Sequence, residues 1–160
     1  MTPFEFEQQW PDGADRVFDV LVDPRLVREV TLGMGAHDVT VQVRPGDGTI
    51  EVTIEAARRT PDGGDDERSV RTIHWSIDRR NATWDHVTLG YEDTITAKGS
   101  LHLVEISPCR TRLITRGSIH VDAGPMSARL ERQLVAVFEK QADREVRLLQ
   151  RRIERAVAST

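Results

Sequence analysis

Hydrophobic and polar residues alternate at the start of the chain, which predicts a β-strand with one buried face at about residues 4–10. The apolar residues share one parity and polar residues fill the other: Phe4, Phe6 and Trp10 against Glu5, Glu7 and Gln9. Apolar residues at helical spacing then predict two short helices within residues 14–32. We expect Asp12 to cap the first helix and Asp23-Pro24 to begin the second, because Asp is a good N-cap and Pro a favoured first helical residue.

A block of six strands separated by polar turns follows. Five of them show period-two alternation, with the apolar residues Val39, Val41 and Val43; Ile50, Val52 and Ile54; Ile73, Trp75 and Ile77; Val87, Leu89 and Tyr91; and Leu113, Ile119 and Val121. The remaining strand, at about 98–106, has no clear buried face, because Leu101 and Leu103 oppose Val104 and Ile106 in parity. Short consecutive strands with tight turns favour an antiparallel meander over βαβ units.

The last predicted element is a long helix at about 125–156, which begins at Gly124-Pro125 and contains no further Gly or Pro. Its apolar residues share one broad face: Leu130, Leu134, Val137, Phe138, Ala142, Leu148, Leu149, Ile153 and Ala156. The elements together predict the α+β class. We expect a seven-stranded curved antiparallel sheet, two short helices between strands 1 and 2, and a long C-terminal helix, all in a single domain covering residues 1–160.

Composition and charge narrow the function classes. The chain has 160 residues, 38% of them hydrophobic and 30% charged, which suits a globular domain with a real core. Its net charge of −4 gives no basic excess for nucleic acid or for an anionic membrane. The first residues lack the pattern of a signal peptide, and no apolar run approaches the roughly 18 residues of a membrane span. We therefore expect a soluble cytoplasmic protein without membrane insertion.

The order of elements resembles the START-like (SRPBCC, Bet v 1-like) helix-grip superfamily. The segment ADRVFDVLVDP, residues 14–24, is similar to the first helix of that superfamily, which runs into an Asp-Pro that begins the second. The opening FEFEQQW and the closing SARLERQLVAVFEKQADREVRLL resemble, more narrowly, a bacterial branch of uncharacterised proteins. The resemblance implies a cavity between the concave sheet and the long helix. Members include lipid and hormone carriers, aromatic polyketide cyclases and co-chaperone domains, so the fold alone selects no function.

The predicted lining of this cavity combines the inward apolar positions of the strands with the inner face of the long helix. We expect it to include Val41, Val43, Val52, Ile54, Ile73, Trp75, Ile77, Leu89, Tyr91, Leu113, Ile119, Leu134, Phe138, Gln141 and Glu145. Gln141 and Glu145 interrupt the apolar face of the helix, with Arg152 nearby. They either orient the polar end of a ligand or lie at a wet pocket mouth. Tyr91 either offers its hydroxyl to a ligand or is an ordinary core residue.

The histidines and the cysteine give no pattern of a reactive centre. We expect His74, His86 and His120 to face solvent, because their parity opposes that of the apolar residues in their strands. No HxH, HExxH or CxxC spacing occurs, and the single cysteine, Cys109, lies in a predicted turn. The sequence therefore predicts no metal site, no catalytic residue and no cofactor.

Three functions remain open. The favoured one is non-catalytic binding of a small hydrophobic or amphipathic molecule that resembles a lipid, a polyketide or an isoprenoid. The first alternative is an enzyme of the aromatase/cyclase type, in which Tyr91, Glu145 or a histidine moves protons. The second alternative is a co-chaperone-like module that binds another protein through an outer face.

Overall fold

The computed structural model describes residues 1–158, with side chains through Arg155, so the side chain of Ala156 lies outside the described part. The elements follow the predicted order: β1 (Thr2–Trp10), α1 (Ala14–Leu21), α2 (Pro24–Gly33), β2 (Asp38–Pro45), β3 (Thr49–Arg58), β4 (Glu67–Ser76), β5 (Asn81–Thr88), β6 (Ile95–Ser107), β7 (Arg110–Val121), the short 3-10 turn η1 (Gly124–Met126) and α3 (Ser127–Ala158). The predicted α+β architecture is confirmed.

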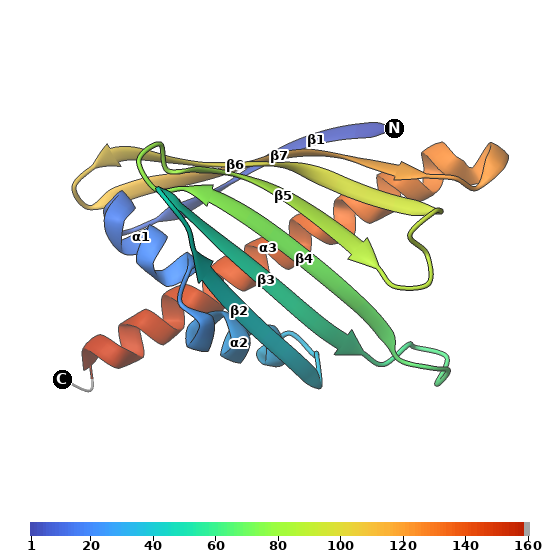
Figure 1. Ribbon diagram of the computed structural model, residues 1–160, viewed down its shortest axis with the longest axis horizontal. Helices are drawn as coiled ribbons and strands as arrows, with labels where there is room; N and C mark the ends of the chain where they lie inside the picture. The colour runs from blue at the N-terminus through green and yellow to red at the C-terminus, as the bar shows by residue number, and fades with distance from the viewer. Residues whose placement is uncertain (159–160) are drawn as a thin grey trace.

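All seven strands form one antiparallel sheet in the order β1-β7-β6-β5-β4-β3-β2. The first strand therefore pairs with the last, from Thr2 opposite Ile119 to Trp10 opposite Thr111. The sheet curves around α3, which crosses its concave face, while α1 lies at the end near the β6–β7 hairpin and α2 lies beside β2 and α3 (Figure 1). The concave face of the sheet and the inner face of α3 both contribute to the wall of one cavity.

Helix α3 presents its apolar residues to the sheet at spacings of three and four, as an amphipathic helix should. The inner residues are buried or packed against the core: Leu130, Leu134, Phe138, Val146, Leu149 and Ile153. The prediction that Val137 lies on the inner face is wrong, because its side chain is 45% exposed. No helix in the described part of the chain is long and apolar enough to cross a membrane.

One buried carboxylate that the sequence did not reveal fixes the first turns of α3 to the sheet. Glu131 is 2% exposed, and it accepts hydrogen bonds from Thr2 Oγ1 at 2.7 Å and from the Val121 N–H at 2.9 Å. The amino group of Met1 lies 3.1 Å from it, and His120 Nδ1 lies 3.7 Å away. The two hydrogen bonds lower the pKa of Glu131 to about 2, with the Met1 amino group adding to the effect.

The two short helices begin in different ways. Asp23 caps α2 as predicted, accepting from the N–H groups of Arg25 at 3.0 Å and Leu26 at 3.2 Å. The predicted cap of α1 is wrong: Gly13 is the N-cap residue, and the Ala14 N–H donates to the side chain of Glu105, 3.0 Å away. The carboxylate of Asp12 instead pairs with Arg16 at 3.5 Å.

The predicted buried face of β5 is wrong, and the sequence left that of β6 open. In β5 the inward residues are Ala82, Trp84 and His86, one position out of phase with the prediction. Leu89 and Tyr91 follow the end of β5, in a turn, and are 47% and 54% exposed, so the prediction that they face α3 is wrong.

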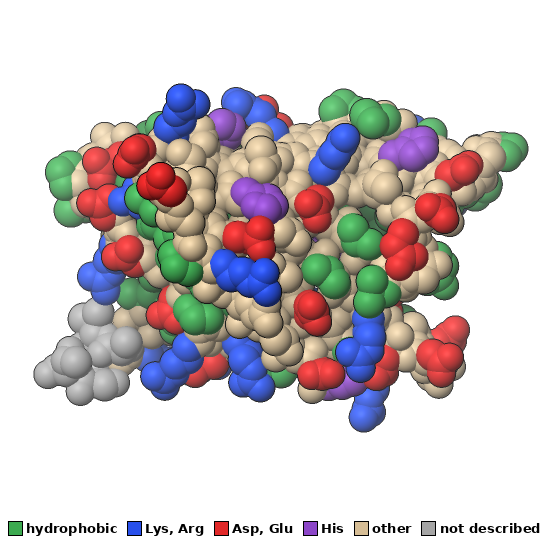
Figure 2. All heavy atoms as spheres, viewed as in Figure 1, with side chains coloured by type: hydrophobic (Ala, Val, Ile, Leu, Met, Phe, Trp, Pro, Cys, Tyr) green, Lys and Arg blue, Asp and Glu red, His purple; other side chains and the backbone are tan. Residues whose placement is uncertain are grey.

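In β6 the structure resolves the ambiguity. Leu103 is 8% exposed and Leu101 lines the cavity, whereas Val104 and Ile106 are 40% and 48% exposed. The outer face of the sheet carries charges of both signs scattered among small apolar groups (Figure 2). That distribution is typical of a solvated face.

Candidate functional site

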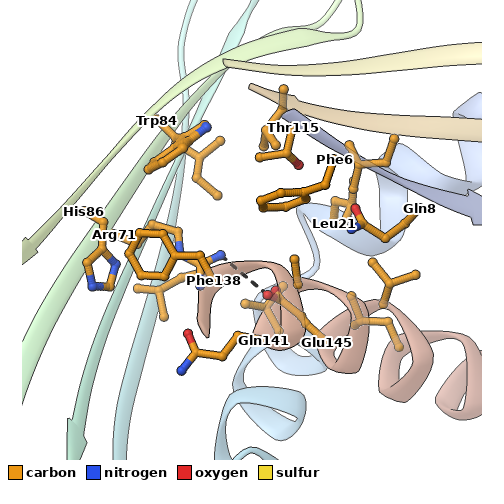
Figure 3. A pocket seen from close by; sticks show the side chains of 18 of the residues that line it. Phe6, Gln8, Leu21, Arg71, Trp84, His86, Thr115, Phe138, Gln141 and Glu145 are labelled. Atoms are coloured by element: carbon orange, nitrogen blue, oxygen red, sulfur yellow. Dashed lines mark hydrogen bonds and ion pairs between the residues drawn. The ribbon is translucent and has the colours of Figure 1, made fainter. Parts of the chain in front are cut away.

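The candidate site is a cavity of about 120 Å³ between the concave face of the sheet and α3 (Figure 3). One water needs roughly 10–15 Å³, so the space is large enough for a small organic molecule. The walls come from β1, from β3 to β7, from α1 and α2, and from the inner face of α3. Apolar side chains dominate them, which is the usual make-up of a small-molecule pocket.

An aromatic cluster forms one wall. Phe4 and Phe6 on β1 stack with ring centroids 5.3 Å apart. The centroid of Phe4 also lies 6.1 Å from that of Trp84 and 6.5 Å from that of Phe138, with which it forms a T-shaped pair. The Trp84 indole N–H donates to the Ser100 carbonyl at 3.3 Å, so its polar tip is satisfied within the sheet. The faces of these rings offer an apolar surface to a bound molecule.

An arginine from the sheet and a glutamate from α3 meet in the cavity. On β4 the inward positions are Trp75, Ile73 and Arg71, and Arg71 Nη1 donates to Glu145 Oε2 on α3 at 3.5 Å. The side chains of Arg71 and Glu145 are 37% and 21% exposed, so this long ion pair adds no more than about 1 kcal/mol to the free energy of unfolding. Gln141 lies one helical turn before Glu145 and lines the same cavity while remaining exposed. In the described part of the chain the Arg71 side chain makes one hydrogen bond, to Glu145, so most of its five N–H donors are available.

His86 extends this polar group from β5. Its ring packs against the edge of Phe138 with centroids 5.5 Å apart. Burial, together with the positive charges of Arg71 and Arg58, lowers the pKa of His86 to about 4. The imidazole is therefore neutral near pH 7. Burial and the nearby Arg71 also lower the pKa of Arg58.

The amide of Gln8 lies on β1 between the apolar side chains of Phe6 and Trp10. Its side chain is 6% exposed, and Nε2 donates to Asp143 Oδ1 on α3 at 3.1 Å. Its Oε1 is buried and accepts a hydrogen bond from no group in the described part of the protein. The indole nitrogens of Trp75 and Trp10 are also buried and unpaired, but only Trp75 lines the cavity. Buried polar atoms without partners are uncommon in folded proteins.

The structure distributes the predicted lining residues over three environments. The wall of the cavity includes Ile54, Ile73, Trp75, Leu113, Phe138, Gln141 and Glu145. Val52 and Ile119 are fully buried in the core, and Val41, Val43, Ile77 and Leu134 pack against it half-buried, all outside the wall. Leu89 and Tyr91 are on the surface, as described above. Arg152 does not reach Glu145; it pairs with Glu29 on α2 at 3.0 Å.

Sequence reasoning missed the polar residues that matter most here. Gln8 shares its parity with Phe6 and Trp10, and Arg71 shares its parity with Ile73 and Trp75, so the period-two pattern placed both on the inner face. Their polar character hid them, because among the strand residues only aliphatic and aromatic positions were assigned to the wall. His86 was assigned to solvent, and that prediction is wrong because β5 begins at Asn81 and follows the parity of Trp84. His74 and His120 are exposed, as predicted.

Comparison with known proteins gives a likeness of structure alone. No protein-family model matches the chain, and no curated protein is similar to it in sequence. A protein from Thermus thermophilus has a similar structure, with a TM-score of 0.71, 12% identity, and coverage of 97% of this chain and 99% of that one.

Two structures whose names carry an activity are also similar. An aromatase/cyclase from Streptomyces gives a TM-score of 0.65 at 16% identity, covering 98% of this chain and 95% of its own. Norcoclaurine synthase from Thalictrum flavum, in complex with dopamine and hydroxybenzaldehyde, gives 0.64 at 15% identity, with coverage of 92% and 86%. At such identities the likeness is one of fold. The chain has the α+β helix-grip fold, with a cavity between its sheet and its C-terminal helix.

Proposed function

We propose that the chain binds a small hydrophobic or amphipathic molecule, such as a lipid, a polyketide or an isoprenoid-like compound, in the cavity between the sheet and α3. The observation that carries this proposal is the make-up of the cavity wall. Five phenylalanine and tryptophan side chains and several aliphatic ones surround a space of about 120 Å³ into which a few polar groups point. An apolar body gains free energy from such a wall, and the polar groups fix its orientation.

The polar groups define the direction of the ligand. Trp75, Ile73 and Arg71 lie two residues apart along one face of β4, so Arg71 is roughly 13 Å from Trp75 along the strand. The apolar body of the ligand therefore lies between the aromatic rings, with a polar end toward Arg71, Glu145 and Gln141. The Arg71–Glu145 pair is long and partly exposed, and its rearrangement around a ligand costs little.

A catalytic pocket is the second candidate, and His86 is the observation that favours it. The neutral imidazole can accept a proton, it lines the cavity, and two proteins of similar structure are named as a cyclase and a synthase. A pKa of about 4 makes the ring a weak base, however, and proton transfer is most effective when the pKa is near the working pH. The polar groups of the cavity therefore support binding better than catalysis.

The test is an NMR titration of the chain with 4-propylanisole, a small apolar probe without a hydrogen-bond donor. We expect the methyl signals of Ile73 and Leu113, which line the cavity, to shift in a saturable way, while those of exposed Ile106 stay in place. Ala142→Leu extends a side chain into the cavity and should weaken binding about tenfold, equal to about 1.4 kcal/mol.

The matched control is Ala136→Leu, which makes the same change on the exposed face of α3 and should leave binding unchanged. Shifts that spread over the surface, or equal binding by both variants, would reject the cavity as the binding site. If the cavity is the binding site, native mass spectrometry of the protein purified from its own host would identify the bound molecule by its mass.

A further inference from the structure

The Gln8 amide is the polar side chain of the inward row of β1 that lines the cavity, and it is buried. Its neighbours of the same parity are Phe4, Phe6 and Trp10. Figure 3 shows its side chain pointing from β1 into the cavity, toward Leu21. An amide buried among apolar groups costs free energy unless each of its polar atoms finds a partner.

Asp143 fixes which end of the amide faces the cavity. The carboxylate of Asp143 only accepts hydrogen bonds, so the NH₂ group of Gln8 must face it, and Nε2 lies 3.1 Å from Asp143 Oδ1. The carbonyl Oε1 is thereby turned away from α3. It is buried, and no donor of the described protein reaches it. Because Gln8 lines the cavity, a donor on a bound molecule is the partner that this acceptor lacks.

The buried indole nitrogens do not indicate a ligand group in the way that the Gln8 carbonyl does. Within the described residues, Trp10 and Trp75 both leave Nε1 unpaired, and Trp10 is not among the residues that line the cavity. The core thus tolerates an unpaired indole N–H away from any ligand. Gln8 differs because its second amide group is already bound to Asp143, so the orientation of the free carbonyl is set by the protein.

We infer that Gln8 determines specificity by accepting a hydrogen bond from a hydroxyl group on the ligand, with Asp143 as its positioning residue. The inference rests on the proposed binding function and adds a second polar position to the ligand: the hydroxyl group of an alcohol or phenol at Gln8, apart from any polar end near Arg71. A carboxylate at this place would face the lone pairs of Oε1 and has no proton to donate. A cationic head would lie in a cavity that also holds the guanidinium of Arg71.

The test compares 4-propylphenol with its methyl ether, 4-propylanisole, by NMR titration of the intact chain. The two probes share their apolar body, and only the phenol donates a hydrogen bond. We expect the wild type to prefer the phenol, and we expect Gln8→Met to reduce that preference about fivefold, equal to about 1 kcal/mol for one hydrogen bond. Gln9→Met is the matched control, because Gln9 is exposed on the other face of the same strand, and it should keep the wild-type preference.

A second variant tests the positioning role without removing Gln8. Asp143→Asn offers an NH₂ group to Gln8, so the glutamine amide is free to turn and the carbonyl is no longer held toward the cavity. We expect the preference for the phenol to fall in this variant while the affinity for 4-propylanisole stays the same. A variant that had merely lost its fold would lose both affinities together, and urea unfolding of each variant separates the two results.

The outcomes separate this inference from the function on which it rests. If neither probe binds the wild type in the cavity, the proposed function fails. If both bind there with equal affinity, the cavity stands and the role of Gln8 is overturned. If Asp143→Asn keeps the full preference for the phenol, Asp143 does not set the orientation of the amide.

Discussion

Filling the cavity should stabilise the protein while it weakens binding, and Ala142→Leu is the substitution that tests this. Ala142 is partly buried on the inner face of α3 and lines the cavity. Leucine adds three carbon atoms at this position, and each buried CH₂ contributes about 0.8 kcal/mol, which gives an upper value of about 2.4 kcal/mol. Loss of rotamer freedom costs about 0.5–1 kcal/mol. We therefore expect the free energy of unfolding to rise by about 1–2 kcal/mol.

Urea denaturation followed by far-UV circular dichroism measures this change, with Ala136→Leu as the control. Ala136 is exposed on the same helix, so its substitution should change the free energy of unfolding by less than about 0.5 kcal/mol. For a chain of this size about 1 kcal/mol corresponds to a Tm shift of about 2–4 °C, which thermal unfolding can confirm.

A loss of stability in Ala142→Leu beyond that of the control would refute the reasoning. It would mean that the sheet and α3 already fill the space in solution, since inserting carbon atoms into a close-packed core costs about 1–3 kcal/mol. Natural binding sites commonly give up stability for function, so the combination of higher stability and weaker binding is the signature of a functional cavity.

Three further predictions concern His86, Glu131 and Gly117. The NMR signals of His86 should titrate near pH 4. Arg71→Met should raise the midpoint of this titration, because the substitution removes a positive charge near the ring. A wild-type midpoint above pH 6 would contradict the burial of the ring. The pKa of Glu131 is lowered to about 2, so its contribution to the free energy of unfolding is complete above about pH 4.5 and disappears as the pH falls toward 2. The urea midpoint of the wild type should therefore fall over this range more than that of Glu131→Gln; parallel curves would refute the role of the carboxylate. A Cβ at Gly117 would lie 2.7 Å from the Trp84 ring, so Gly117→Ala should lower the free energy of unfolding by about 1–3 kcal/mol in urea titrations, and no loss would show that the sheet moves freely there.

The sequence predicted the fold because each local signal agreed with the others. Alternation marked β3 and β4 without ambiguity, Asp23-Pro24 marked the start of α2, and the long amphipathic segment after Pro125 marked α3. The strand β5 failed because Ala82 is a weak hydrophobic signal and His86 a polar one, whereas Val87 and Leu89 at the opposite parity looked apolar. Burial on one face overrode that pattern through the pairing of β5 with β4 and β6.

The candidate site was less predictable for a related reason. Parity already placed Gln8 and Arg71 on the inner face, but their charge and hydrogen-bonding capacity argued for solvent, and only the assembled sheet and helix show what surrounds them. Gln8 lies opposite Leu113 across one strand pair and bonds to Asp143 on a helix more than a hundred residues away, so no local pattern could reveal its fixed orientation.

A polar residue at a position that faces the core lowers the stability of the fold. Such residues are concentrated at functional sites. In this protein Gln8, Arg71 and His86 are three such positions, and all three line the same cavity. Apolar residues there would stabilise the core more simply, because a buried carbonyl without a donor costs about 1–3 kcal/mol. A ligand that brings a hydroxyl group removes that cost at Gln8 in the bound state alone. The unpaired Gln8 carbonyl thus destabilises the unliganded protein, and for the same reason the protein should bind an alcohol or phenol more tightly than the corresponding methyl ether.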